Sequence, residues 1–480
     1  MNRTSLLAVA LAVALLAGCA SVEHPASRVP QQVTTLAASA DGQVTVGTPA
    51  RDWWRALNDP LLDTLVAEAV QRNHEVQAAL ATVKAARSVA DATAREALPQ
   101  GSLQAQAQRQ RPSTAEVDPY DQGLPRPPSS SMATLGQGLA WEIDLFGRVG
   151  TATAVADRRA DGAMADLHAA TALLQAEVVR HYTGLRLQQH TLRLLGEEAA
   201  AHAARTRQLQ LRVDAGLADR REALAAQGDV QRVQAEAAQA AAALHAHLAA
   251  LSVLNGRSPA ERSAWHQTLL TPATLPAVPA DAALVQPTDL LARRPDVARA
   301  DAQLRAALGE TVLAERAHLP RLSLNLALGL NAPFGNLGDP GALRYAAGPA
   351  LSWDWLDFGR IQARAAAARA GQDAAVHAFE HAVLKALQDS EVAVRQWSAA
   401  RTALVAAQQA EGLAAQSAAH TRTRVEAGLE PPAAALDGTA AHLRAQRSAL
   451  AVQADALLAY GQAQLALGAW QPQAATVAAR

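Results

Sequence analysis

The chain has 480 residues, of which 50% are hydrophobic but only 3% are aromatic, and its formal net charge is −1. Much of the apolar share is alanine, the strongest helix former but a poor filler of wide cores, so the composition favours long, thin, closely packed helices. The nearly neutral charge gives no basis for nucleic-acid binding or for a polybasic membrane patch.

The N-terminus has the pattern of an export signal. Arg3 precedes an apolar stretch from Leu6 to Leu16, which is too short for a permanent transmembrane helix. The stretch ends in Leu16-Ala17-Gly18-Cys19, which resembles the bacterial lipobox, and this cysteine is the only one in the chain. A disulfide within one chain is therefore excluded.

We expect residues 1–18 to be a lipoprotein signal peptide and Cys19 to carry covalent lipid, with residues 19–58 forming the lipidated N-terminal segment. Ala20 stands where an aspartate often retains lipoproteins at the inner membrane, so it favours the outer membrane. The alternative is an ordinary signal peptide with a chance cysteine. No further cofactor is expected.

The chain repeats itself with an offset of 212 residues, which three pairs of segments keep without a gap. The pairs are Trp141–Arg148 with Trp353–Arg360, Arg212–Leu217 with Arg424–Leu429, and Gly256 with Gly468. Upstream, Leu98-Pro99 and Leu319-Pro320 correspond at an offset of 221, so the nine extra residues fall in a proline- and serine-rich loop before Trp141.

This register divides the chain into two copies of one unit. Repeat 1 is predicted over residues 59–256 and repeat 2 over 289–470. A proline-broken connector over 257–288 joins them, and residues 471–480 form a C-terminal tail.

Each Leu-Pro pair is followed by a predicted β-hairpin, over about 99–145 in repeat 1 and about 320–357 in repeat 2. The leucines at 322, 324, 326, 328 and 330 alternate with small or polar residues, and Leu103, Ala105 and Ala107 alternate with glutamines. The returning segments alternate too, at Leu135, Leu139, Trp141 and Ile143, and at Leu351, Trp353 and Trp355. One apolar and one polar face are typical of transmembrane β-strands, with Trp141, Trp353 and Trp355 ending the strands at the interface; the alternative is a pair of soluble hairpins.

Long helices are predicted after each hairpin. Heptad spacing from Leu167 to Val213 indicates helices packed on helices, and Arg148 to Ala215 would span ~100 Å. Gly216 and Gly428 are predicted to end the outward helices in tight helix–helix turns.

The return path is predicted from three further helices, over 216–256, 289–317 and about 60–97. Their lengths bring the chain back to the hairpins, leaving the two turns ~100 Å away. Two hairpins give four strands, but a membrane barrel needs at least eight. Strands that enter a membrane must therefore close a barrel shared by several chains.

At this point the chain resembles the TolC-like outer-membrane factors, in particular the lipid-anchored NodT and OprM type, from about Trp53 to Trp470. The resemblance rests on Trp53, Asp59-Pro60-Leu61, Trp141–Arg148, Arg293–Asp296, Leu319-Pro320, Asp357–Arg360 and Leu467–Trp470. It implies a mainly α protein with a transmembrane β-barrel: a homotrimer with a 12-stranded barrel in outer-membrane lipid and a 12-helix periplasmic tunnel. It also implies two partners, a periplasmic adaptor and an inner-membrane pump such as an RND transporter.

The resemblance also implies site residues. The turns at Val213, Gly216 and Leu217 and at Val425, Gly428 and Leu429 resemble the family's tip motif, where an adaptor docks. The structural alternative is that valine and leucine only staple the turn. Asp437 matches the family's aperture aspartate, or is a solvated surface residue; its counterpart in the first copy is Ala225.

No catalytic constellation or metal-ligand pattern is found in the sequence, so we expect no enzyme and a passive conduit driven by a partner. We read the Arg293–Asp296 segment first as a helix start. The predicted function is export of small molecules across the outer membrane. The alternatives are a duct for type I protein secretion, a periplasmic adaptor, or a structural coiled-coil lipoprotein.

Overall fold

The computed structural model describes residues 28–29, 44–46, 52–117, 119–120, 122–125, 128–261, 263–279, 284–286 and 289–469. The predicted signal peptide, Cys19, Trp470 and the tail lie outside them. The described residues belong to two compact units. The strand unit contains residues 83–162 and 300–378, and the helix unit contains residues 28–82, 163–299 and 379–469.

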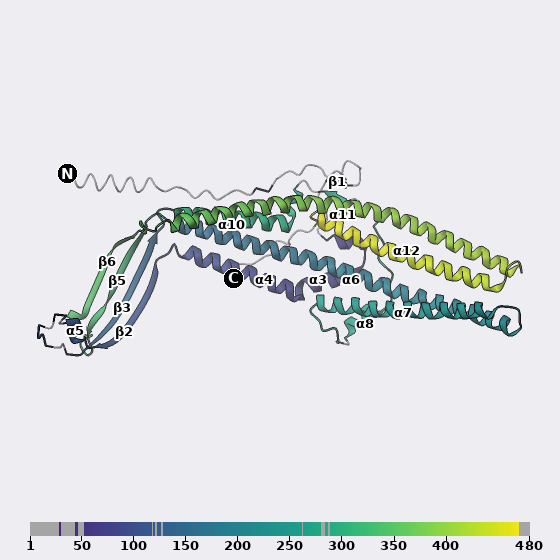
Figure 1. The fold of residues 1–480 in the computed structure, drawn as a ribbon, viewed down its shortest axis with the longest axis horizontal. Coiled ribbons are helices and arrows are strands. Elements are labelled where there is room, and N and C mark those ends of the chain that lie inside the picture. Colours follow the sequence, from purple (N-terminus) through teal and green to yellow (C-terminus); the bar gives the residue numbers. More distant parts are fainter. Residues whose placement is uncertain are drawn as a thin grey trace. The chain divides into compact units, whose positions relative to one another are not determined.

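The principal helices come in pairs of equal length (Figure 1). The members of the three pairs have 67, 35 and 22 residues. They are α6 (Arg148–Asp214) with α11 (Arg360–Glu426), α7 (Arg220–Leu254) with α12 (Pro432–Ala466), and α4 (His74–Arg95) with α10 (Pro295–Arg316). The first two pairs keep the 212-residue offset and the third keeps 221, so the duplication extends to the backbone.

Two helices that we predicted as continuous are each broken at one residue. Asn73 separates α3 (Pro60–Arg72) from α4, and Arg294 separates α9 (Leu290–Arg293) from α10; both residues are extended, with ψ of 127° and 122°. The predicted single helices over about 60–97 and 289–317 are therefore wrong at these points. At the second break, Pro295 lacks an N–H and disfavours a helical conformation in the residue before it. At the first break, Asn73 Oδ1 caps α4 by accepting hydrogen bonds from the amides of Glu75 at 3.0 Å and Val76 at 3.1 Å.

The two breaks hold equivalent positions in the repeats. Asn73 Nδ2 donates to the Leu254 carbonyl at 3.1 Å, and Arg294 Nη1 donates to the Ala466 carbonyl at 3.3 Å. These carbonyls end α7 and α12, where helices have unsatisfied acceptors. Arg294 also chelates Asp296 at 3.0 and 2.8 Å, so this segment has the structural role expected of it.

The four long strands form one antiparallel sheet in the order β2-β3-β5-β6 (Figure 1). The strands are β2 (Gln100–Gln110), β3 (Ser130–Ile143), β5 (Arg321–Pro333) and β6 (Leu343–Ser352). The two hairpins pair with each other through β3 and β5, so β2 and β6 are the edges of the sheet within this chain. A short helix, α5 (Thr114–Val117), lies in the long loop between β2 and β3.

The sheet has one apolar and one polar face, as the alternation predicts. Residues directly opposite each other across an antiparallel pair lie on the same face. Leu139 pairs with Leu326, Trp141 with Leu324 and Leu135 with Leu330. On the other face Ala140 pairs with Asn325, and Thr134 with Asn331. Leu135, Leu139, Leu324 and Leu326 are 40–46% exposed, so the described residues of this chain do not cover the apolar face.

The last strand is shorter than predicted. β6 ends at Ser352, which pairs with Arg321, so Trp353 and Trp355 follow the strand instead of ending it. The next residue before β5 is Pro320, which has no N–H to donate, and β6 has no second neighbour among the described strands. Trp141 stays in β3 because it also pairs with Leu324 of β5.

The indole groups of Trp141 and Trp353 nevertheless make equivalent contacts. Trp141 Nε1 donates to the Ala97 carbonyl and Trp353 Nε1 to the His318 carbonyl, both at 2.9 Å. Each bond ties the returning strand to the carbonyls that follow α4 or α10. Both tryptophans therefore fix the junction between helix and strand.

The helix unit has its own apolar core. Three buried aromatic rings pack together in it: Trp53 meets Tyr460 edge to face with 6.1 Å between ring centroids, and Trp397 is tilted against Tyr460 at 5.3 Å. Gly461 makes room, since a Cβ there would lie 2.7 Å from the Trp53 ring. Trp53 belongs to a short helix, η1 (Trp53–Leu57), and Asp59 then caps α3.

The connector between the repeats is more ordered than predicted. It contains α8 (Ala264–Leu270) and the three-residue strand β4 (Leu284–Gln286). β4 pairs in parallel with β1 (Val44–Val46), which falls in the segment before repeat 1.

Helix packing in the helix unit follows the predicted heptads. The positions from Leu167 to Val213 that we placed on the seam of α6 are all buried or half-buried. Leu195 packs with Val233 and Ala240 of α7, and Leu209 packs with Ala223 and Ala226. By length and composition alone α7 could cross a membrane, and much of its apolar content is alanine.

Candidate functional site

The first helical turn is built around Gly216. Gly216 has φ of 69° and its amide donates to the Val213 carbonyl at 2.9 Å, while the Leu217 amide donates to the Arg212 carbonyl at 2.7 Å. This pair of hydrogen bonds is the Schellman motif, which needs a residue in the left-handed region. No atom lies within 4 Å of a Cβ added at Gly216, so backbone conformation, and not space, requires the glycine.

The second turn repeats the first. Gly428 has φ of 70°, its amide donates to Val425 at 3.0 Å, and the Leu429 amide donates to Arg424 at 2.8 Å. Arg424 also pairs with Glu430 at 2.6 Å across the turn. The two predicted tips therefore have one backbone geometry.

The valines and leucines of the tips behave differently. Val213 and Val425 are half-buried, and Val213 packs on the cluster formed by Leu209, Ala223 and Ala226. Leu217 and Leu429 are 69% and 66% exposed. Val213 therefore staples the first turn, whereas the two leucines present apolar surface that the fold of this chain does not use.

Asp437 lies on α12 and is half-exposed. Its Oδ1 forms an ion pair with Arg205 Nε of α6 at 2.8 Å, and Arg205 lies 3.7 Å from Asp229 of α7. The first copy has Ala225 at the position of Asp437, so this bridge has no counterpart. Asp437 was predicted from the sequence, but its partner Arg205 was not.

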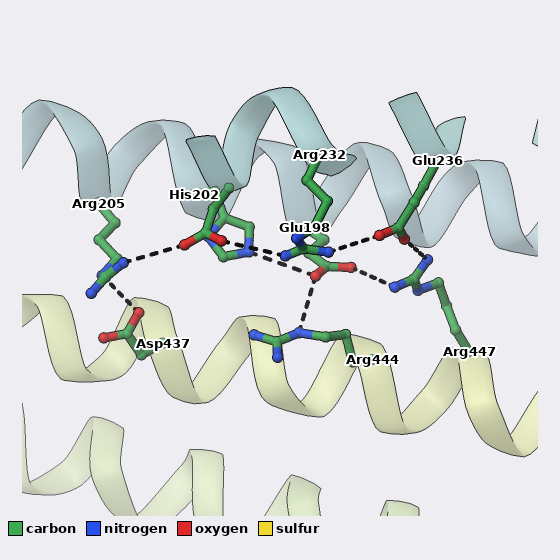
Figure 2. Close-up of polar contacts among 9 residues, drawn as sticks. Glu198, His202, Arg205, Arg232, Glu236, Asp437, Arg444 and Arg447 are labelled. Atoms are coloured by element: carbon green, nitrogen blue, oxygen red, sulfur yellow. Dashed lines mark hydrogen bonds and ion pairs between the residues drawn. The ribbon is translucent and has the colours of Figure 1, made fainter. Parts of the chain in front are cut away.

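A charged cluster continues from Asp437 along α6, α7 and α12 (Figure 2). Its centre is Glu198 of α6, which is fully buried. Arg444 Nε and Arg447 Nη2 of α12 each approach a Glu198 oxygen at 3.1 Å, and His202 Nε2 lies 3.6 Å away. The contacts of Glu198 with the two arginines are ion pairs and not hydrogen bonds, because neither Glu198 oxygen has an aligned donor.

Glu236 of α7 completes the cluster. Arg447 Nη1 donates to Glu236 at 2.8 Å and Arg232 Nη1 donates to it at 2.7 Å. The hydrogen bond from Arg447, opposed by burial and joined by the bond from Arg232, lowers the pKa of the Glu236 carboxyl. Arg447 thus bridges a carboxylate of α6 to a carboxylate of α7.

The sequence held a signal for this cluster. Glu198, His202 and Arg205 are spaced four and three residues apart, which places them on one face of α6. On α12, Asp437 and Arg444 are seven residues apart and also share a face. Only the contact between the two helices, which belong to different repeats, reveals that these faces meet.

The described residues hold no group of three or more His, Cys, Asp or Glu side chains that could bind a metal ion. Cys19, the predicted lipidation site, lies outside them. The geometry therefore offers two equal turns, an exposed apolar leucine at each, and a network of ion pairs joining the two repeats.

Comparison with known proteins decides the family. A family model described as outer membrane efflux protein matches residues 65–257 and 287–469, which is more than half of the chain. The chain belongs to this family. The two matched segments begin 222 residues apart and end 212 residues apart, so they follow the two repeats.

Individual relatives agree with this assignment to the outer membrane efflux family. The chain is 30% identical over 386 residues to the fusaric acid resistance protein FusA of Burkholderia cepacia, covering 77% of this chain and 70% of FusA. It is 28% identical over 389 residues to the outer membrane protein OprJ of Pseudomonas aeruginosa, covering 79% and 78%.

Solved structures agree as well. The outer-membrane channel OprN matches with a TM-score of 0.82 and 26% identity over 93% of this chain and 99% of that one. The CmeC outer membrane channel of Campylobacter jejuni shares the fold, with a TM-score of 0.82 at 18% identity over 94% and 95%. The resemblance to TolC-like channels is confirmed, and so are the fold class and the outer-membrane location. The family is one of outer-membrane efflux proteins, and the matched structures are outer-membrane channels.

Proposed function

We propose that this efflux channel subunit works as a homotrimer in a tripartite assembly, in which a periplasmic adaptor and an inner-membrane pump such as an RND transporter drive export. The observation that carries the proposal is the sheet. Its edges, β2 and β6, have no further partner among the described strands, and one face is mainly apolar, with a row of leucines on β5.

Unpaired strand edges cannot face lipid, because each unsatisfied backbone group there costs several kcal/mol. Three chains joined edge to edge give 12 strands, with the apolar leucines toward outer-membrane lipid and the polar face toward a water-filled interior. The lipid on Cys19 adds a second anchor. The duct is passive and carries small molecules, with no catalytic role.

The tips are proposed as the adaptor contacts. Leu217 and Leu429 are exposed, lie beside glycines of equal geometry, and are not needed by the core. Exposed apolar side chains on a rigid turn are suited to a partner helix that covers them. Val213 packs against the helices of the first turn, Val425 is half-buried in the second, and Gly216 and Gly428 set the backbone.

Asp437 is proposed to line the periplasmic aperture, where three copies would attract cations and resist anions. The ion pair with Arg205 partly neutralises each carboxylate, so the ring is weaker than three free charges. Divalent cations are expected to compete with Arg205 for the carboxylate.

The test is conductance of the purified mature protein in planar bilayers. The wild type should form a trimer that conducts and is blocked by divalent cations at the periplasmic side, and Asp437→Asn should weaken the block several-fold. Asp219→Asn is the matched control, because it removes a charge next to the first turn while asparagine can still cap α7. A monomer without conductance would disprove the channel assembly, and unchanged block would remove only Asp437 from the aperture.

A further inference from the structure

From the row of Gln100 to the hairpin loops, the polar face of the sheet carries a single charged side chain, that of Arg344. Arg344 of β6 lies opposite Gly329 of β5, Gly329 lies opposite Gly136 of β3, and Gly136 lies opposite Gln104 of β2. The other positions on this face, from the row of Gln100 outward, are glutamine, asparagine, serine, threonine, methionine, proline, alanine or glycine. Arg344 is therefore an isolated cation on a neutral surface.

The two residues beside Arg344 in its row across the sheet are glycines. Gly329 and Gly136 contribute no side chain, and Gly329 has no room for one, since a Cβ there would lie 2.5 Å from the Leu135 carbonyl oxygen. The arginine is exposed, and no acidic partner for it is found in the part of the chain that the structure describes. The charge of Arg344 can therefore interact with ions in the solvent.

An open hollow of about 390 Å³ lies against the sheet, and most of its lining residues belong to the polar face, including Gln100, Ser102, Gly138 and Asn325. When a curved sheet closes into a barrel, the concave side becomes the interior. Arg344 would then face the duct.

Arg344 is the second residue of β6, directly after the loop that joins β5 to β6. The loop between β2 and β3 lies at the same end of the sheet, away from the ends that join α4, α6, α10 and α11. The described connecting segments beyond the strands carry charges of both signs, at Arg111, Glu116 and Asp339. In a barrel this end is the outer mouth.

We propose that three copies of Arg344 form an anion-attracting ring at the outer mouth of the duct. The inference rests on the proposed trimeric channel. A potential of about one kT at the mouth raises the local concentration of small anions about threefold and lowers that of cations by the same factor. The ring favours the exit of anionic solutes, such as carboxylates and chloride, and salt weakens it because the guanidinium groups face water.

The experiment measures the reversal potential of single channels under a potassium chloride gradient. Arg344→Gln should shift it toward the cation-selective value, with a change of about threefold in the permeability ratio, and Arg344→Glu should shift it further. The matched control is Arg109→Gln. Arg109 of β2 lies at the same end of the sheet as Arg344, but it is opposite Ser131 on the apolar face. The shift should shrink as the salt concentration rises.

The outcomes separate this inference from the proposed function. If the wild type forms no conducting trimer, the channel proposal fails before Arg344 is tested. If the wild type conducts and Arg344→Gln leaves the reversal potential unchanged, the ring is disproved while the channel stands. An equal shift in Arg109→Gln would also overturn it, because the effect would then be general surface charge.

Discussion

The long helices and the turns of the two repeats have the same backbone geometry, but the repeats do not carry the same charges. α6 and α11 have equal lengths, as do α7 and α12, and the turns at Gly216 and Gly428 differ by 1° in φ. The charged cluster is not duplicated, since Glu198 corresponds to Ala410 and Arg447 to Ala235. Glycines and prolines at fixed positions preserve the shape, whereas side chains that join one repeat to the other are free to diverge.

The same contrast appears in the helix unit at the half-buried pair His181 and His247. Their Nδ1 atoms lie 3.1 Å apart, and the His247 ring fills the space that a Cβ on Gly184 would need. The second repeat has Ala393 and Ala459 at these positions. Two imidazoles in one copy are thus replaced by two small apolar side chains in the other.

The largest expected effect comes from breaking the charged cluster. Arg447→Met leaves the buried Glu198 with the half-exposed Arg444 and lowers the free energy of unfolding by about 3 kcal/mol, measured by denaturant titration in detergent. The double variant Glu198→Met with Arg447→Met removes both charges. The equivalent positions of the other repeat, Ala410 and Ala235, are also uncharged. The double variant should recover most of the loss.

A control for this cycle is Arg193→Met, which breaks the exposed pair with Glu197 and should change stability by less than about 0.5 kcal/mol. If the double variant is less stable than Arg447→Met, the cluster is not an interdependent unit. The divergence between the repeats would then have another cause.

The second prediction uses pH to separate the repeats. Burial, followed by the charge of Arg180 and the neighbouring His247, lowers the pKa of His181 to about 4, against the weaker opposing effect of Glu177. The unfolded chain therefore takes up this proton at higher pH than the folded one. The stabilisation is complete above about pH 6.5 and is lost as the pH falls toward 4.

His181→Gln should remove this loss, so between pH 7 and pH 4 the wild type should lose about 1–2 kcal/mol more than the variant. Thermal unfolding at a series of pH values measures it. The matched substitution His420→Gln, on the exposed surface of α11, should leave the pH profile unchanged. A wild-type profile that coincides with that of His181→Gln would contradict the assignment.

The sequence predicted features that local pattern or the repeat itself determines. The turn glycines, the two faces of the sheet and the seam of α6 all follow from backbone conformation or from periodicity within one segment. The 212-residue register then transferred each prediction from one copy to the other. Such features need no knowledge of which segments meet.

Features that depend on distant partners were missed. β6 ends at Ser352 because its neighbour reaches Pro320, which only the strand register reveals. The cap formed by Asn73 resembles a mid-helix residue until its contact with Leu254 is known. Glu198 and Arg447 were not selected because their helices are far apart in sequence.

The smallest expected effects test whether the two backbones are truly equal. Gly216→Ala and Gly428→Ala each force alanine into the left-handed region, with open space around the new methyl group. Each should therefore lower the free energy of unfolding by about 1 kcal/mol, and by the same amount within error.

Gly196→Ala is the control with the opposite sign. Gly196 lies inside α6, has ordinary helical geometry, and also has open space at its Cβ position. Alanine there should stabilise the protein by about 0.5–1 kcal/mol, because only the helix propensity changes. If one tip variant is neutral while the other is destabilised, then the two turns differ in energy despite their equal dihedral angles. The repeats would then have diverged in backbone preference as well as in charge.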